Sequence, residues 1–296
     1  MLAIIPKGKI FLTVSATLVV LSLAALAVWG LKLDIDFTGG TSWEIKFENG
    51  RPNNEEILTV LSDYKLEPAV FQPVGEQGLI IKFRAVNENT HEAMKRDLNG
   101  SWPIEELRFD SIGPTIGREL QSKSLKAIFY VLILIVAYIA WAFRKVSKPV
   151  ASWKYGLIAV IALIHDVAIP AGVFAVLGHF YGIEVGSFFV TALLTVMGFS
   201  VHDTIVVFDR IRENLKRRAG DDFSVTINNS VNETLARSIN TSLTVLLVLS
   251  AIYFLGGATI KYFALALILG VFFGTYSSIF VAGPLLAYWA GRRRPE

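Results

Sequence analysis

The most unusual feature of this chain is an aspartate inside a long apolar stretch. Asp203, preceded by His202, lies in the run of residues 188–208, about a turn and a half from its end at roughly 3.6 residues per turn. A charged side chain at the centre of a membrane helix costs about 2.5–3.5 kcal/mol, and less near the helix ends. A carboxylate in this position therefore indicates either an ion path or a buried partner.

A second polar site stands near the middle of another apolar run, residues 155–177. It consists of His165 and Asp166. Pro170 follows and removes the backbone hydrogen bond to the carbonyl of Asp166, so a kink is expected there. This site has two interpretations, helix packing and proton transfer, and packing is the one that the residues alone favour.

A third polar site lies where the apolar run of residues 239–255 begins. Arg237 stands just before this run, and Thr241 lies about one turn further on the same face. On the helix of the first site, Thr204 shares a face with Asp203. An arginine in this place is by itself typical of a positively charged anchor at the cytoplasmic surface.

Asp203 and Arg237 together suggest a proton switch. A carboxylate taken out of water holds its proton more readily, and a nearby arginine opposes this effect. A pair whose separation changes with conformation would therefore load and release a proton, with the arginine as the electrostatic switch because it never deprotonates. Each proton that crosses the membrane potential supplies about 2.3 kcal/mol per 100 mV. The alternative is a static buried pair that fixes helix packing.

The elements that position these sites are six apolar runs. The chain has 296 residues, of which 53% are hydrophobic, and a membrane helix needs about 20 mostly apolar residues. The runs cover residues 10–31, 125–143, 155–177, 186–208, 239–255 and 262–289. The fold class predicted is an all-α membrane bundle of six transmembrane helices with an inserted α+β domain.

The basic residues predict the orientation of these helices. Lysines and arginines cluster before the first run, between the second and third, after the fourth and at the end of the chain. By the positive-inside rule both termini are cytoplasmic, and the large first loop lies outside the cytoplasm. The net charge of +3 reflects this bias, so no nucleic acid is expected as a partner, and lipid surrounds the helices.

The polar segment of residues 32–123 is long enough for a small domain. Its patterns predict strands at 42–47, 69–74, 79–83 and 104–112, with helices at 53–64 and 88–98. The order β-α-β-β-α-β is typical of a ferredoxin-like split βαβ fold. The domain has no cysteine for a disulfide, and His91, its only histidine, is interpreted as a surface residue. Without a catalytic, metal-binding or phosphate-binding motif, neither an enzyme nor a cofactor is expected.

Glycine-rich segments flank this domain on both sides. Gly39 and Gly40 precede it, and Gly113 and Pro114 follow it. Glycine permits tight turns and close backbone approach, so these segments are either simple connectors or hinges on which the domain swings.

The predicted division of the chain has four parts. Residues 1–31 form an N-terminal helix, residues 32–123 the inserted domain, residues 124–291 five further helices, and residues 292–296 a basic tail. Residues 209–237 form a cytoplasmic loop with apolar side chains at every fourth position, which predicts an amphipathic helix at the membrane surface. Gly270 and Gly274 permit close helix contact within or beyond the chain.

Four motifs in this order resemble the SecF family, the smaller membrane subunit of the bacterial SecDF translocation accessory complex. They are DIDFTGGT at 34–41, GPTIGREL at 113–120, VHDTIVVFDRIREN at 201–214 and RSINTSLT at 237–244. The resemblance covers nearly the whole chain, including the six runs and the large first loop. His202 stands where the family often has asparagine, so a histidine that titrates near neutrality is expected to tune the proton path.

The resemblance implies a fold of the resistance-nodulation-division type, with SecD as a pseudo-symmetric partner. It also implies a place in the inner (plasma) membrane of a bacterium, with the large first loop periplasmic or extracellular. It also implies help to protein export through the SecYEG channel, driven by the proton motive force, with YajC and YidC as further partners and an unfolded polypeptide as the cargo. Asp203 and Arg237 match the family's proton-linked aspartate and arginine. Two other functions stay open: a subunit of a proton-driven small-molecule exporter, and a passive scaffold for the translocon.

Overall fold

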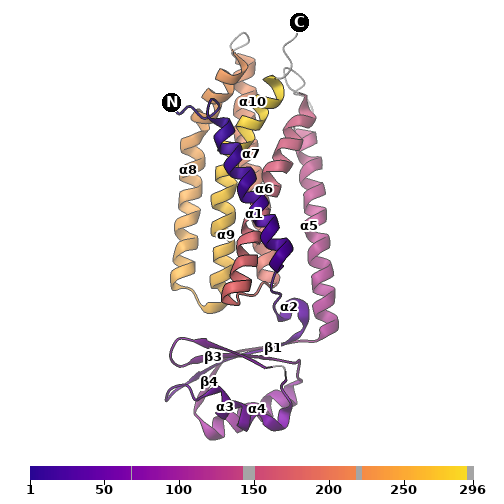
Figure 1. Cartoon of the computed structure of the whole chain (residues 1–296), viewed down its shortest axis with the longest axis vertical. Helices are drawn as coiled ribbons and strands as arrows, with labels where there is room; N and C mark the ends of the chain where they lie inside the picture. The colour runs from indigo at the N-terminus through magenta and orange to yellow at the C-terminus, as the bar shows by residue number, and fades with distance from the viewer. Residues whose placement is uncertain (68, 143–150, 218–221, 292–296) are drawn as a thin grey trace. The chain divides into compact units, whose positions relative to one another are not determined.

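The computed structural model describes residues 1–67, 69–142, 151–217 and 222–291. The chain divides into two compact units. The first, Met1–Lys32 with Lys126–Glu296, consists mainly of long helices and is called the membrane unit. The second, Leu33–Leu125, contains a four-stranded sheet and is called the inserted domain (Figure 1).

The helices of the membrane unit contain the six predicted apolar runs, except for residues 30, 31 and 186, which lie just beyond a helix end, and residue 143, which lies outside the described residues. Within the described residues, six helices are long and apolar enough to cross a membrane. The last of the six is interrupted by a π-helical turn, η2, directly before Gly283 and Pro284. The bounds are α1 (Gly8–Trp29), α5 (Pro114–Ala142), α6 (Ser152–Tyr181), α7 (Ser187–Arg217), α8 (Phe223–Leu255), α9 (Ala258–Ser277), η2 (Ser278–Ala282) and α10 (Gly283–Gly291).

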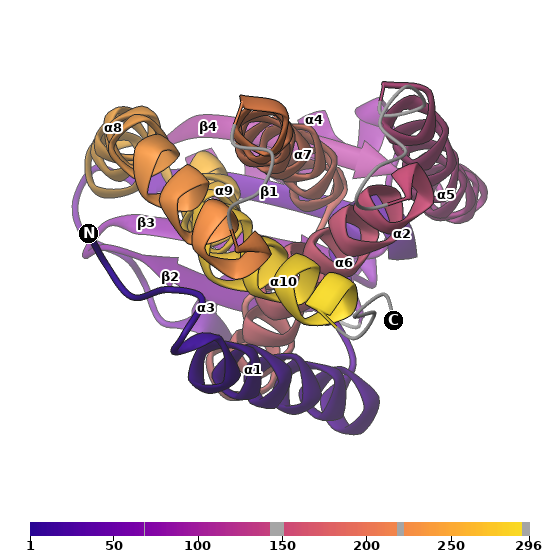
Figure 2. The same ribbon diagram turned by 90° about the horizontal axis from the view of Figure 1, so that it is seen from above.

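Three helices form the centre of the membrane unit and three lie around it. In the most apolar part of each helix, 67% of α6, 50% of α7 and 61% of the α9 segment are buried, against 11% of α1, 6% of α5 and 17% of α8. Viewed from above, α9 lies between α1 and α8 (Figure 2). The outer faces of α1, α5 and α8 are therefore left for lipid or for another protein.

The segment 209–237, predicted as a cytoplasmic loop with an amphipathic helix at the membrane surface, is arranged differently. It is not a separate surface helix, because its first part continues α7 and its last part begins α8. Ile227 and Val231 are fully buried in the same apolar cluster as Ile211 of α7. The regular apolar spacing thus reflects packing of α8 on α7. The predicted basic tail, residues 292–296, and the basic positions 144, 145, 148 and 218 lie outside the described residues.

Glycines set the distance between α7 and α9. A Cβ added to Gly270 would lie 2.1 Å from the side chain of Val196, and one added to Gly274 would lie 3.3 Å from Cβ of Ser200. The predicted small-residue contact therefore lies within this chain. Such close approach lets short polar side chains reach across from one helix to the next.

The N-terminal segment is bound to the start of α8 by two asparagines. The side-chain oxygen of Asn228 accepts hydrogen bonds from the amides of Ile4 and Ile5, and that of Asn232 accepts one from the amide of Leu2. Both asparagine amides donate in return to the carbonyl of Leu2. Ile4 and Ile5 are buried, so the segment is both packed and hydrogen-bonded.

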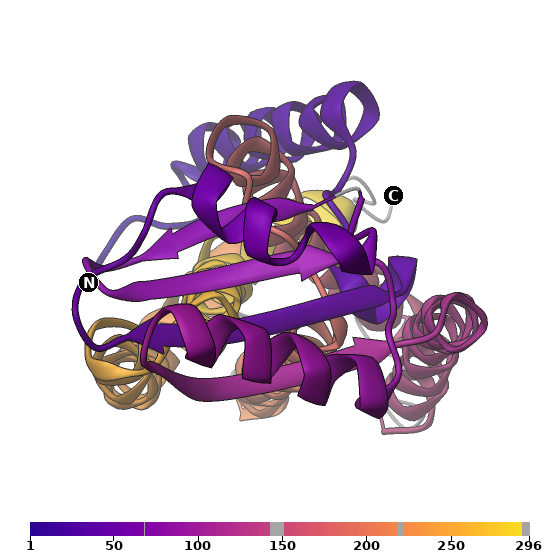
Figure 3. The ribbon, with the colours of Figure 1, turned by 90° about the horizontal axis from the view of Figure 1, so that it is seen from below.

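The inserted domain has the predicted order of strands and helices. Its sheet has the order β2-β3-β1-β4 with antiparallel neighbours, and its two longer helices, α3 and α4, lie on one face of that sheet (Figure 3). The elements are α2 (Ile35–Thr38), β1 (Gly40–Phe47), α3 (Asn54–Val60), the 3₁₀ turn η1 (Ser62–Tyr64), β2 (Val70–Val74), β3 (Gly78–Phe83), α4 (Glu88–Ser101) and β4 (Ile104–Ile112).

The core of the inserted domain follows from alternation along its central strands. Every second residue of β1 and β3 points to the helices and is buried, as expected for strands with one covered face. The buried cluster contains Trp43, Ile45, Phe47, Ile57, Leu61, Leu66, Leu79, Ile81, Phe83, Met94 and Leu98. This single core is what holds a domain without disulfides.

Candidate functional site

Asp203 lies in α7 and is held by two serine hydroxyls from other helical elements. Its side chain is buried, with 6% of the residue exposed. Ser238 of α8 donates a hydrogen bond of 2.9 Å to Oδ1, and Ser278 at the start of η2 donates one of 3.0 Å to Oδ2. The carboxylate thus connects three elements of the membrane unit through neutral partners.

Asp166 of α6 forms a second site of the same kind. It is fully buried, and its Oδ2 accepts hydrogen bonds from Ser277, at 2.7 Å, and from Ser200 of α7. Its Oδ1 lies 2.8 Å from Nδ1 of His165. The predicted pair His165–Asp166 is therefore a direct contact, and it is joined by hydroxyls that the prediction did not include.

The predicted partner of Asp203 does not face it. Arg237 is exposed and makes no hydrogen bond or ion pair with any residue that the structure describes. The next residue, Ser238, turns inward and takes the place next to the carboxylate. A step of one residue along a helix rotates the side chain by about 100°, at 3.6 residues per turn, so Asp203 and Arg237 make no direct contact in this conformation. Their role as a pair whose separation changes stays a prediction.

The remaining predicted residues divide into exposed and buried ones. His202 and Thr241 are exposed, on the outer faces of α7 and α8. Thr204 is buried, and within the described parts of the chain its hydroxyl has no hydrogen-bond partner. A buried hydroxyl without a partner costs free energy, so Thr204 is a polar side chain next to Asp203 that the described residues do not satisfy.

Sequence-based prediction missed the hydroxyl partners Ser238, Ser277 and Ser278. Ser238 belongs to a line of small hydroxyl residues at every fourth position of α8, and this line was the available signal. All of its members are buried: Thr226, Ser230, Thr234, Ser238 and Ser242. A polar line on one face of an apolar helix predicts contact with another polar group.

This arrangement suits a carboxyl group that changes its protonation state. A serine hydroxyl donates to an ionised carboxylate and accepts from a protonated one, so Asp203 keeps its hydrogen bonds in either form. A buried ionised carboxylate without a cation is costly, and the described partners of Asp203 are hydroxyls. Proton uptake is therefore the chemistry that the surroundings of Asp203 permit.

The inserted domain contains a polar cluster of a different kind, and it corrects the interpretation of His91. His91 is buried, with 4% exposed, rather than at the surface. Its Nε2 lies 2.6 Å from Glu106, and its ring stacks on Phe109 with centroids 3.6 Å apart. Glu106 also accepts hydrogen bonds from Trp43 (2.7 Å) and Lys95 (3.0 Å).

A bulge in the sheet explains why this burial was not predicted. The pairing of β1 with β4 shifts between Glu44 and Ile45, which leaves Leu107 as an extra residue in β4. Strict alternation would put residues 106 and 109 on opposite faces, but the extra residue brings both to the face that α4 covers. His91 therefore meets a carboxylate and an aromatic ring together.

Charge pairing sets the ionisation of Glu106. Burial by itself tends to raise the pKa of Glu106, but hydrogen bonds from His91, Lys95 and Trp43 outweigh this and hold the pKa below its ordinary value. The hydrogen bond to Glu106 raises the pKa of Lys95. This carboxylate is thus kept ionised by its partners.

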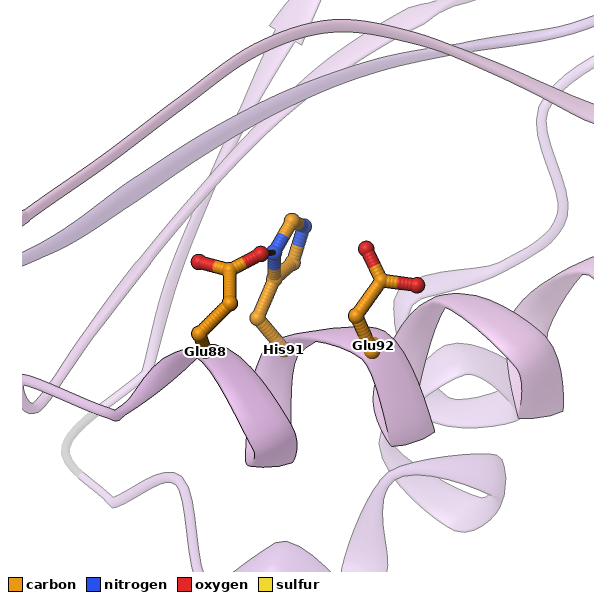
Figure 4. Close-up of side chains that lie close together, drawn as sticks. All are labelled: Glu88, His91 and Glu92. Atoms are coloured by element: carbon orange, nitrogen blue, oxygen red, sulfur yellow. Dashed lines mark hydrogen bonds and ion pairs between the residues drawn. The ribbon is translucent and has the colours of Figure 1, made fainter.

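Three side chains at the edge of this cluster are close enough to share a metal ion. Glu88, His91 and Glu92 offer ligand atoms within 4.8 Å of one another (Figure 4). However, Nδ1 of His91 already lies 3.1 Å from Glu88, and Nε2 contacts Glu106. Because both ring nitrogens are engaged and both flanking glutamates are exposed, the hydrogen-bond network accounts for the cluster without an ion.

The two glycine-rich segments pack against each other. Gly39 and Gly40 have φ values of 75° and 139°, which favour glycine. A Cβ added to Gly39 would lie 2.7 Å from Cα of Pro114, and one added to Gly117 would lie 2.8 Å from the amide nitrogen of Gly39. Gly113 has open space around its Cβ position. The segments are therefore in backbone contact, and their role as hinges stays a prediction.

Known proteins share this architecture and sequence. A family model described as "Protein export membrane protein SecD/SecF, C-terminal" matches residues 91–292. "Protein translocase subunit SecF" of Thermobaculum terrenum is 45% identical over 95% of this chain and 92% of its own length. The protein of the same name from Anaerolinea thermophila is 38% identical over 98% of this chain and 94% of its own length.

A solved structure agrees with these sequences. The crystal structure of SecDF, a translocon-associated membrane protein from Thermus thermophilus, has a TM-score of 0.84 and 32% identity over 99% of this chain. This chain spans 39% of that longer protein. A crystal structure of SecDF in super-membrane-facing form gives a TM-score of 0.71, with 32% identity over 99% of this chain and 39% of that chain.

The six long helices and the inserted sheet define a multi-pass membrane protein with an α+β domain between its first and second spans. The matches extend across both units of this architecture. The chain belongs to the SecF family of protein translocase subunits. The predicted resemblance is confirmed, and a role in protein translocation comes with the family.

Proposed function

We propose that this chain is an accessory subunit of Sec-dependent protein export that couples proton flow to export. The observation that carries the proposal is Asp203, a buried carboxylate in a membrane-spanning helix with hydroxyl partners from two other elements. Ionisable groups inside membranes are costly and mark ion or proton paths. Thr204, His165 and Asp166 extend the proposed path, and the exposed His202 tunes its pH dependence.

The exposed face of α8 supports a second membrane bundle as partner. Arg237 and Thr241 lie on this outer face, together with the exposed Asn240 and Thr244. Charged side chains at membrane depth normally face protein or a water-filled cavity, so this face needs a cover. The Thermus thermophilus relative is named SecDF and is longer than this chain. SecD is therefore the proposed cover, and Arg237 acts on the proton path from that interface.

The inserted domain is the proposed working part on the far side of the membrane. We propose the ferredoxin-like fold for it, which the element order and the strand order support. Both termini are cytoplasmic in this proposal, and the domain binds emerging unfolded polypeptide along an open strand edge. SecYEG supplies the channel, with YajC and YidC as further partners. The contact of Gly39 with Pro114 serves as the joint.

Two other functions compete with this one. The chain would be a subunit of a proton-driven exporter of small molecules, or a passive scaffold that stabilises a translocon. The names of the relatives favour export of proteins over small molecules. A scaffold would not need a proton at Asp203, so substitution of this residue separates the proposals. Neither proposal includes an enzyme activity or a cofactor other than the proton.

The experiment uses vesicles that contain the full chain, SecD and the Sec channel, with and without an imposed proton gradient. Asp203→Asn keeps the side-chain shape but removes the proton site, and Arg237→Met keeps length but removes charge. Each is expected to abolish the gradient-dependent part of export while folding and association with SecD remain. The double variant is expected to be stable and inactive. His202→Asn, one position away and exposed, is the matched control, with activity retained at a shifted pH optimum.

A static ion pair predicts the opposite pattern. Each single variant would then destabilise the bundle by about 3–5 kcal/mol because it leaves an uncompensated charge, and the double variant would restore stability and export. Export at the wild-type level in Asp203→Asn, with the gradient present, would end the proposal.

A further inference from the structure

We propose that Asp166 and Asp203 take up and release protons as one linked pair, joined by the consecutive hydroxyls of Ser277 and Ser278. This inference rests on the proposed function and deepens it, because it names a second proton-binding group and the residues that connect the two. A single carboxyl group would hold one proton at one depth of the membrane. A linked pair makes the state of one site depend on the other.

The connection lies at the end of α9. Ser277 donates a hydrogen bond of 2.7 Å to Oδ2 of Asp166, and Ser278 donates one of 3.0 Å to Oδ2 of Asp203. Both serines have no exposed surface. Two adjacent residues of one chain segment thus bind two carboxyl groups that belong to different helices, α6 and α7.

A π-helical turn lies directly at these two serines. It begins at Ser278 and is followed by α10, and single π turns inside α-helices occur frequently at functional sites. The wider turn inserts an additional residue into the helix, which changes the direction of the side chains that follow. The segment around it is packed, since Ile279 and Ala282 are buried in the main apolar cluster.

Each serine also has a second acceptor within reach. The hydroxyl of Ser277 lies 3.1 Å from the carbonyl of Gly274, and that of Ser278 lies 2.9 Å from the carbonyl of Thr275. A hydroxyl has one hydrogen, so it donates either to the carboxylate or to the backbone. When the carboxyl group is ionised, the hydroxyl points to it. When the carboxyl group is protonated, its own hydrogen binds the serine oxygen, and the serine hydrogen turns to the carbonyl.

A second connection runs through α7. Ser200 and Asp203 share one face of this helix, and Ser200 donates to Asp166. The close packing of Gly274 against Ser200 holds this contact. Asp166 is therefore hydrogen-bonded to α7, the helix that carries Asp203. It is also hydrogen-bonded to Ser277, the residue next to Ser278, which binds Asp203.

His165 extends the pair at its Asp166 end. Its Nδ1 contacts Asp166, and its Nε2 is buried and has no hydrogen-bond partner in the described ranges of the chain. Tyr276 of α9 stacks on this ring with centroids 6.0 Å apart. A proton that leaves Asp166 has Nδ1 of His165 as its nearest ring acceptor, provided that Nδ1 is the unprotonated nitrogen.

The other titratable groups near the pair face away from it or bind elsewhere. On α7, His202 and Asp209 are exposed. On α8, Arg237 is exposed, and Glu233 binds Arg210. On α1, which packs against α6, the titratable side chain is the exposed Lys9. The pair is thus linked mainly through its own hydroxyls and His165.

The test is a pH titration of the full chain in lipid nanodiscs, followed by infrared difference spectroscopy of protonated carboxyl groups. Asp203→Asn identifies the band of Asp203. In Asp166→Asn, the midpoint of the Asp203 band is expected to move by about one pH unit or more, the size that interacting sites show. An unmoved midpoint in this folded variant would overturn the proposal.

A serine variant tests the connection itself. Ser277→Ala is expected to move the Asp203 midpoint toward its value in Asp166→Asn, because Ser277 binds Asp166 and makes no described hydrogen bond to Asp203. Ser242→Ala is the matched control, since this hydroxyl joins α8 to Thr275 of α9 without touching either carboxyl group. Equal midpoints in wild type and Ser277→Ala would also overturn the proposal, even where Asp166→Asn fails to fold.

The titration needs no SecD, channel or gradient, so its result is independent of the export assay. If Asp203→Asn exports normally but the midpoints move together, the pair exists and the proposed function fails. If Asp203→Asn loses export but the midpoints are independent, the proposed function stands and the linked pair fails.

Discussion

Two carboxylates lie at the centres of polar networks in the two units, and their partners differ. Glu106 of the inserted domain is bound by His91, Lys95 and the Trp43 ring nitrogen, whereas the described partners of Asp203 are serine hydroxyls. Cationic partners stabilise one charge state of a carboxylate, but hydroxyls satisfy both. The comparison teaches that the number of hydrogen bonds does not separate a structural charge from an exchangeable one, and that the kind of donor does.

Glu106→Gln is expected to give the largest loss of stability in this comparison. Glutamine keeps one carbonyl oxygen but turns an amide group toward donors, which leaves buried groups unpaired at a cost of about 1–3 kcal/mol. Amide hydrogen exchange of β1 and β4 in the full chain measures this loss. Glu105→Gln is the control, because Glu105 is exposed on the same strand. Equal protection in the two variants would contradict a structural role for Glu106.

Acid is expected to cause a similar but gradual loss without a mutation. The pKa of Glu106 is held below its ordinary value of 4.5, so its contribution is complete above pH 4.5 and is lost as the pH falls through the lower folded pKa. The pKa of Lys95 is raised above 10.5, so its contribution is complete below pH 10.5 and is lost as the pH rises through the folded pKa.

Exchange protection of the inserted domain, corrected for the intrinsic rate at each pH, is the measurement for this prediction. The contribution of Glu106 to exchange protection should be constant between pH 4.5 and pH 10.5, and it should decline as the pH falls through the folded pKa of Glu106. Glu106→Gln is expected to reduce the acid decline. If Glu106→Gln lost as much exchange protection in acid as the wild type does, the loss would come from other carboxylates.

Asp203→Asn is expected to have the smallest effect on stability, below about 1 kcal/mol, because the asparagine oxygen accepts from one serine and its amide donates to the other. Exchange of the α7 amides measures it. Asp203→Leu, which leaves Ser238 and Ser278 without their acceptor, is the contrasting variant and should cost more. A loss in Asp203→Asn as large as that in Glu106→Gln would place Asp203 among the structural charges.

The fold was largely predictable from hydrophobic patterns, and the errors lie where helices continue beyond their apolar parts. The six apolar runs and the strand order along the chain follow from periodicity. However, α7 extends to Arg217 and α8 begins at Phe223, because Ile211 and Asn214 are buried there against α8. An apolar run measures the membrane-spanning part of a helix, whereas packing decides where the helix ends.

The site was predictable only in its charged members. Asp166 and Asp203 were found because a charge in an apolar run is costly. Ser277 and Ser278 carry no such signal, since serine is common and neutral, and the π turn that begins at Ser278 departs from the 3.6-residue period on which helix prediction rests. Charge also favoured Arg237 over its neighbour Ser238, although the neighbour is the residue that faces inward.

The asparagine contacts of the N-terminal segment have a consequence for the order of synthesis. Leu2 and its partner Asn232 are separated by 230 positions in the chain. At about 5–20 residues per second, the ribosome needs roughly 10–50 s to make the partner after the segment itself. During that interval the segment before α1 has no Asn228 or Asn232 to bind. The helix α1 is made first in the membrane unit, but the hydrogen bonds of the segment that precedes it are therefore among the last to form.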